Sequence, residues 1–124
     1  MYQSKYFCPD EMVCKCCGEV PDDGISEVLL QKLDWLRDFI GEPIHITCMY
    51  RCPQHNEEVG GVPNSQHVAG TAADIWCEGL SVGQLADAAE QVGFDGVGRY
   101  YADEFVHVDC RDGGKSPAYY LWEG

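Results

Sequence analysis

SQHVAGTAADI, residues 65–75 of this 124-residue chain, is the segment from which its organisation follows. His67 offers an imidazole nitrogen and Asp74 offers a carboxylate oxygen, and both are good ligands for a divalent metal such as zinc. From Thr71 to Cys77 the residues are mostly small or apolar, which predicts a mostly buried strand. Because a carboxylate in such a strand is costly to bury unless it is paired or bound to a metal, the segment predicts a metal site.

A third ligand is expected in the later segment EFVHVD, residues 104–109, where His107 is the best candidate. Two histidines and one aspartate leave the fourth position of a tetrahedral zinc open for water, which is typical of a catalytic zinc. Alternation along the segment predicts a strand with its valines on the core face and with His107 and Asp109 together on the other face. Asp109 is expected to orient a ligand histidine, or to pair with Arg111 or Arg99.

The motif Ser-x-His-x-x-Gly-x-Ala-x-Asp, followed by a His-x-Asp strand, resembles the zinc D-Ala-D-Ala carboxypeptidase family. That family includes vancomycin-resistance D,D-dipeptidases and phage cell-wall endopeptidases, and the hedgehog signalling domain is a distant relative in fold. Further matching pieces extend the resemblance over roughly residues 44–111, namely residues 50–56 (YRCPQHN), 60–64 (GGVPN) and 96–100 (GVGRY). The resemblance implies an α+β fold, with two helices packed on an antiparallel sheet that carries a single zinc site of His67, Asp74 and His107.

The resemblance also implies roles for residues around the metal. Glu104 stands in the position of the family's general base, three residues before His107, and is expected on a bent turn because strand residues three apart face opposite sides. Asp103 is the neighbour that could substitute for it. Arg51 is expected to face the substrate and its developing oxyanion, and the alternative is a structural arginine bonded to loop carbonyls. Ser65 is expected either to contact the substrate or to serve only as a turn hydroxyl.

Hydrophobic spacing and turn residues predict the elements that carry these side chains. Leucines at helical spacing, led by Ile25 and stopped by Gly41, predict an amphipathic helix over residues 25–40. Ser81 and Gln84 form a capping-box pattern, so a second helix is expected over residues 81–92. Strands are expected at residues 44–49, 71–77, 96–100 and 105–110, a loop at residues 50–66, and a packed-down strand or cap in the tail that contains Tyr119, Tyr120 and Trp122.

The charge and the apolar pattern limit the partners. Lys plus Arg number 8 and Asp plus Glu number 21, and the resulting net charge of −13 argues against nucleic acid, an anionic membrane or electrostatic anchoring to an anionic wall as partner. No stretch is apolar enough to span a membrane, and residues 1–24 lack the apolar core of a secretory signal. We expect one zinc peptidase domain over residues 1–124, monomeric, made in the cytoplasm of phage-infected or bacterial cells and acting at the periplasm or cell wall.

The eight cysteines leave three interpretations open. Half of them lie in the N-terminal arm of residues 1–24, namely Cys8, Cys14, Cys16 and Cys17. An even count in a short chain favours disulfides, whereas the missing secretory signal favours free thiols. A second, structural zinc on the arm is the third interpretation, although Cys-x-Cys-Cys lacks the usual two-residue spacing.

The predicted function is that of a zinc metallopeptidase that hydrolyses a peptide bond in the stem peptides of bacterial peptidoglycan. It would act as a D-Ala-D-Ala carboxypeptidase or as an L-Ala-D-Glu-type endopeptidase, in the setting of a phage endolysin or a tail-associated wall hydrolase. The alternative is a zinc-retaining module that binds cell wall or protein without catalysis, and Glu104 argues against it. A third hypothesis is a cysteine-rich structural protein with incidental histidines.

Overall fold

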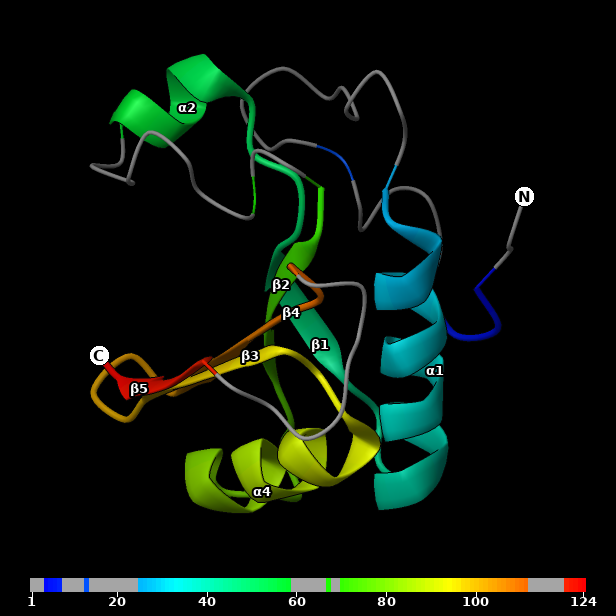
Figure 1. Cartoon of the computed structure of the whole chain (residues 1–124). Helices are drawn as coiled ribbons and strands as arrows, with labels where there is room; N and C mark the ends of the chain where they lie inside the picture. The colour runs from blue at the N-terminus through cyan, green and yellow to red at the C-terminus, as the bar shows by residue number, and fades with distance from the viewer. Residues whose placement is uncertain (1–3, 8–12, 14–24, 59–66, 68–69, 112–119) are drawn as a thin grey trace.

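The computed structural model describes residues 4–7, 13, 25–58, 67, 70–111 and 120–124, which form helices packed on a mixed sheet (Figure 1). The predicted α+β class is confirmed. In the described part of the chain, the strands are β1 (His45–Cys48), β2 (Ala72–Trp76), β3 (Gly96–Tyr100), β4 (Phe105–Asp109) and β5 (Tyr120–Glu123). The helices are α1 (Glu27–Ile40), α2 (Pro53–Glu58) and α4 (Val82–Val92), and none of them is long and apolar enough to cross a membrane.

The strand order among the described residues is β1-β2-β4-β3-β5. The first four strands pair antiparallel as predicted, but β5 pairs parallel with β3. The register explains this difference, because β4 ends with Asp109 opposite Gly96, and β5 begins with Tyr120 opposite the same Gly96. The chain therefore leaves β4 and enters β5 at the same end of β3, on either side of it, and β5 must run in the direction of β3.

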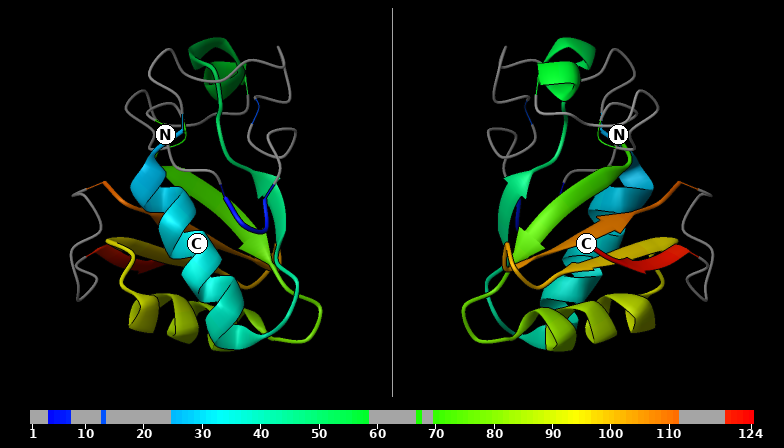
Figure 2. Two further views of the ribbon diagram at one scale, coloured as in Figure 1. Left: turned by 90° about the vertical axis from the view of Figure 1, so that its right-hand side faces the viewer. Right: turned by 90° about the vertical axis from the view of Figure 1, so that its left-hand side faces the viewer.

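Alternation along the strands separates two faces of the sheet. The helices α1 and α4 lie on one face (Figure 2), and the side chains that point at them are fully buried and apolar. This core contains Leu29, Leu33, Leu36, Ala73, Ile75, Leu85, Val97, Val106 and Val108. Burial of each large apolar side chain contributes about 1.5–3 kcal/mol to folding. The opposite face carries Asp74, His107 and Asp109, and for His107 and Asp109 the alternation predicted this.

The helix ends are capped, and the sequence predicted the stop at Gly41 and the capping box of Ser81 and Gln84 but not the cap at Ser26. Ser26 caps α1 by accepting the Leu29 N–H, and Gly41 ends that helix in the left-handed region at φ 70°. Ser81 and Gln84 form the predicted capping box of α4. The expected loop of residues 50–66 contains the short helix α2, which begins at a proline, a residue well suited to the first helical turn.

Candidate metal centre

The pairing of β2 with β4 brings two of the predicted ligands together. Asp74 lies directly opposite His107 in this antiparallel pair, and both side chains leave the sheet on the face away from the helices. His67 comes from the turn before β2, where its carbonyl oxygen accepts the N–H groups of Arg51 and Gly70, each at 3.2 Å. Gly70 has φ 77°, a conformation that favours glycine.

The three predicted ligands converge on one carboxylate oxygen. Asp74 Oδ1 lies 3.2 Å from His67 Nε2 and 3.1 Å from His107 Nδ1, and none of the three residues is more than 8% exposed. Ligand atoms bound to one tetrahedral zinc at about 2.0–2.1 Å lie about 3.3–3.4 Å from one another. Both separations from Asp74 are therefore close to those of atoms that share a metal ion, whereas the set of ligand atoms that all lie within 4.8 Å of one another among the described residues is that of Cys48, His67 and Asp74.

The remaining ring nitrogens fix the tautomers of both histidines. His67 Nδ1 lies 2.8 Å from the Met49 carbonyl oxygen, which can only accept, so this nitrogen carries the proton. His107 Nε2 lies 2.8 Å from the Asp109 carboxylate and donates to it in the same way. In the neutral rings, His67 Nε2 and His107 Nδ1 then point lone pairs at the Asp74 carboxylate. Such an arrangement needs a cation between the groups, either a proton on a ring or a metal ion.

The electrostatics of this cluster favour positive charge beside Asp74. Burial lowers the pKa of His67, but the hydrogen bonds to Asp74 and Cys48 raise it, to about 10 overall. Burial raises the pKa of Asp74, whereas the hydrogen bonds from His107 and His67 lower it, to about 2. Asp74 therefore stays ionised, and a divalent ion could take the place of the ring proton.

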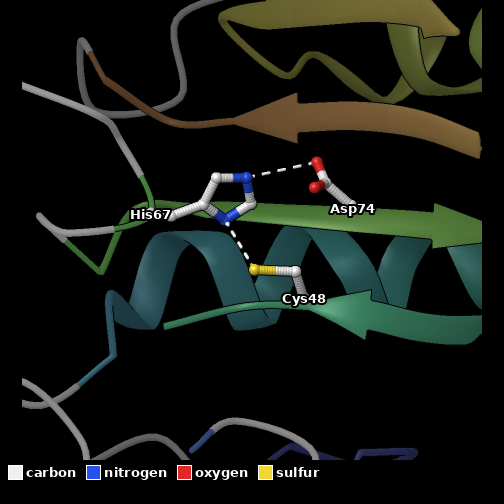
Figure 3. Close-up of side chains that lie close together, drawn as sticks. All are labelled: Cys48, His67 and Asp74. Carbon is white, nitrogen blue, oxygen red and sulfur yellow. Dashed lines mark hydrogen bonds and ion pairs between the residues drawn. The ribbon is translucent and has the colours of Figure 1, made fainter. Parts of the chain in front are cut away.

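Cys48 is a residue near the centre that the sequence analysis did not include among the ligands. Cys48, His67 and Asp74 offer ligand atoms that all lie within 4.8 Å of one another, which is close enough to hold a metal ion (Figure 3). The thiol contacts His67 Nδ1 at 3.7 Å, however, whereas Asp74 contacts Nε2. Cys48 thus lies at the opposite ring nitrogen from Asp74, and that nitrogen already donates to the Met49 carbonyl.

Asp109 combines two of the alternatives that the sequence left open. It accepts from His107 Nε2 and it also forms an ion pair with Arg111, whose Nη2 lies 2.6 Å from Oδ2. Burial raises the pKa of Asp109, and the hydrogen bonds from Arg111 and His107 lower it, to about 2. The third alternative, a pair with Arg99, does not occur, because Arg99 binds Asp87 and Glu90.

Glu104 occupies the bent turn that the sequence predicted, before the first residue of β4. Its φ of 58° lies in the left-handed region, where it is the one non-glycine among the described residues. Glu104 and Asp103 are exposed and line a cleft of about 940 Å³ that Trp76 and Phe105 also line. The lining of this cleft includes none of His67, Asp74 and His107, so the cleft and the predicted ligands are separate features of the structure.

The other predicted site residues have mixed outcomes. The Arg51 guanidinium donates to Asn56 Oδ1 at 2.9 Å and lies 3.6 Å from Cys48 Sγ, so it stands beside the centre but is held by side chains of its own loop. Ser65 lies outside the described residues. Among the cysteines that the structure describes, all carry free thiols, namely Cys48, Cys52, Cys77 and Cys110. The cysteines of the N-terminal arm lie outside the described residues, so the second zinc proposed for that arm stays a prediction.

Comparison with known proteins gives consistent matches. The model of the peptidase M15 family matches residues 5–109. The peptidoglycan L,D-endopeptidase MepK of Escherichia coli K12 is 31% identical over 92 residues, which are 68% of this chain and 50% of that protein. The zinc D-Ala-D-Ala carboxypeptidase of Streptomyces albus G is 34% identical over 90 residues, which are 69% of this chain and 35% of that protein. The matched part of the chain thus spans half or less of the length of these relatives.

Proposed function

The chain belongs to the peptidase M15 family, and on this premise we propose that it is a zinc peptidase that hydrolyses a peptide bond of bacterial peptidoglycan. The observation that supports this most strongly is the convergence of two histidine nitrogens on Asp74 Oδ1, at 3.2 and 3.1 Å. The donor set of two imidazoles and one carboxylate suits zinc and leaves one tetrahedral position for water.

His67, Asp74 and His107 would hold the metal in this proposal. When bound, zinc supplies an acidified water and polarises the scissile carbonyl. The protein's own contribution is to fix which nitrogens are available. The Met49 carbonyl keeps the proton of His67 on Nδ1, and Asp109 keeps the proton of His107 on Nε2. Both rings therefore present unprotonated nitrogens beside Asp74.

Glu104 is the proposed general base and acid. Its carboxylate would accept a proton from the attacking water and return it to the leaving amine, which is a poor leaving group until it is protonated. Its exposed position at the end of a turn, three residues before His107, supports this role, because both water and peptide can reach the carboxylate. Arg51 is the proposed oxyanion partner, and Ser65 a proposed substrate contact.

The proposal extends to the peptide bond that is cleaved and to the place where the protein acts. We propose cleavage either at the terminal D-Ala-D-Ala bond or at an interior link such as L-Ala-D-Glu, since a relative named as a carboxypeptidase and one named as an endopeptidase match the chain to a similar extent, over 69% and 68% of it. The proposed place of action is the cell wall, and a phage lysin or tail-associated hydrolase is the proposed setting.

Digestion of purified peptidoglycan with the zinc-loaded protein tests the function. Mass spectrometry of the soluble products should find new amino and carboxyl termini within stem peptides, and the identity of those termini would assign the bond. The Glu104→Gln protein, loaded with zinc in the same way, is the matched control and should release almost nothing. An undigested wall with fully zinc-loaded wild-type protein would contradict the enzyme and favour a zinc-retaining binding module.

A further inference from the structure

The strand β5 lies next to β3, outside the segment that the family model matches, and it contacts the metal centre. Trp122 on β5 is opposite Gly98 on β3. A Cβ atom on Gly98 would come within 2.5 Å of the indole, so only glycine at this position lets the ring lie against the sheet. The indole Nε1 donates to Tyr100 Oη at 2.8 Å, and the ring centre lies 5.0 Å from that of His107.

The aromatic side chains of β5 also contact Arg111, which is linked to His107 through Asp109. The Arg111 guanidinium lies over the Tyr120 ring at 4.5 Å and beside the Trp122 ring at 5.6 Å, which are distances typical of cation–π contacts. From there it reaches Asp109 through two side-chain hydrogen bonds, Nε to Oδ1 at 2.9 Å and Nη2 to Oδ2 at 2.6 Å. A bidentate pair of this kind fixes the plane of the carboxylate.

The Asp109 carboxylate has no room to adopt another orientation. Its side chain is 0% exposed, and a Cβ atom added to Gly96 would come within 2.3 Å of Oδ2. Oδ2 is also the atom that accepts the His107 Nε2–H at 2.8 Å. The direction of the Asp109 carboxylate therefore determines the direction in which His107 Nδ1 points.

We propose that Arg111, held by the aromatic side chains of β5, is a positioning residue for the metal ligand His107. It acts through Asp109 and does not touch metal or substrate. A histidine whose far nitrogen is anchored binds metal more tightly, because less rotational freedom is lost and the correct tautomer is already present. The inference rests on the proposed metal centre, and it adds Arg111 and β5 to the residues on which zinc affinity depends.

Arg99 provides a matched control for a purely structural effect. Arg99 lies on β3, and its side chain is 15% exposed, against 26% for the side chain of Arg111. Like Arg111, it makes two hydrogen-bonded contacts with carboxylate oxygens, and both contacts are ion pairs. Its partners are Asp87 and Glu90 of α4, away from the metal centre. Loss of either arginine removes a comparable ion pair, but only Arg111 is connected to His107.

The test measures zinc dissociation constants by competition with a chelator for wild-type, Arg111→Met, Arg111→Lys and Arg99→Met proteins. We expect Arg111→Met to weaken zinc binding by about 10–100-fold, Arg111→Lys to weaken it less, and Arg99→Met to leave it unchanged. Nitrogen-15 NMR of the zinc-free proteins should show His107 protonated at Nε2 in wild type and a tautomer mixture in Arg111→Met.

Four results would overturn the inference. Wild-type affinity in a folded Arg111→Met protein, or an equal loss in Arg99→Met, would show that Arg111 contributes only general stability. A single unchanged His107 tautomer in Arg111→Met would show that Asp109 alone orients the ring. A wild-type protein that binds no zinc at all would contradict the proposed function as well, so the two failures are distinguishable.

Discussion

Both faces of the sheet carry buried side chains at β4, but the free-energy consequence of burial differs between the two faces. On β4, Val106 and Val108 point at the helices and are 0% exposed, while His107 and Asp109 point the other way and are 8% and 0% exposed. Burial of the valines stabilises the fold directly. Burial of the polar pair costs free energy unless each group finds a partner. One strand thus supplies both the stability of the fold and a polar cluster that is complete only with a cation.

Among the variants, Glu104→Gln should have the largest effect, which is a loss of turnover that leaves the helix-covered face of the sheet unchanged. General acid–base transfer typically contributes about 10²–10⁴-fold, so hydrolysis of a stem peptide should fall by at least about a hundredfold. Zinc content should remain near that of wild type, because Glu104 is not one of the proposed ligands. Turnover and bound zinc would be measured on the same preparation.

Asp103→Asn is the control for that change, because Asp103 lines the same cleft one residue earlier in the turn. We expect a much smaller loss of turnover than in Glu104→Gln. Wild-type turnover in Glu104→Gln would exclude Glu104 as the base, and a large loss in Asp103→Asn would then assign the role to its neighbour.

Leu33→Ala should act on the helix-covered face and leave the polar face unchanged. Leu33 is 0% exposed on α1, and a buried leucine replaced by alanine usually costs about 2–5 kcal/mol of folding free energy. Denaturant unfolding of zinc-free protein should show this loss. Zinc affinity of the folded fraction should stay at the wild-type value, and a parallel loss of affinity would mean that the two faces are not independent.

Much of the fold could be predicted because its signals are local. The leucines of α1 repeat at helical spacing, and its end is marked by Gly41. The valines of β4 alternate with His107 and Asp109, which assigns both faces from five residues of sequence. These patterns depend only on the periods of helix and strand, so no knowledge of distant neighbours is required.

The features that the sequence did not predict depend on contacts between distant segments. Cys48 comes close to His67 because β1 pairs with β2 through an irregular register after Ile46, which no local pattern encodes. The parallel pairing of β5 depends on the side of β3 to which the chain returns after β4. The contact of Arg111 with the Trp122 ring follows from that pairing, so it could not be predicted either.

Ser81→Ala should have the smallest effect among the stability changes. Ser81 caps α4 by accepting the Gln84 N–H at 3.1 Å, and loss of such a cap typically costs about 1 kcal/mol. The free energy of unfolding should fall by that amount while zinc affinity and turnover stay at wild-type values. A loss comparable to that of Leu33→Ala would contradict the view that the core, and not the caps, supplies most of the stability.

The most direct test of the proposed metal ligands is the zinc content of His107→Ala and Cys48→Ser proteins, measured after identical loading and gel filtration. Cys48 contacts His67 Nδ1, whereas His107 contacts Asp74, which lies at the other nitrogen of the His67 ring. We predict that His107→Ala loses the zinc of this site and that Cys48→Ser retains it. Retention by His107→Ala together with loss from Cys48→Ser would contradict the proposed ligands, and would place the metal between Cys48, His67 and Asp74 instead.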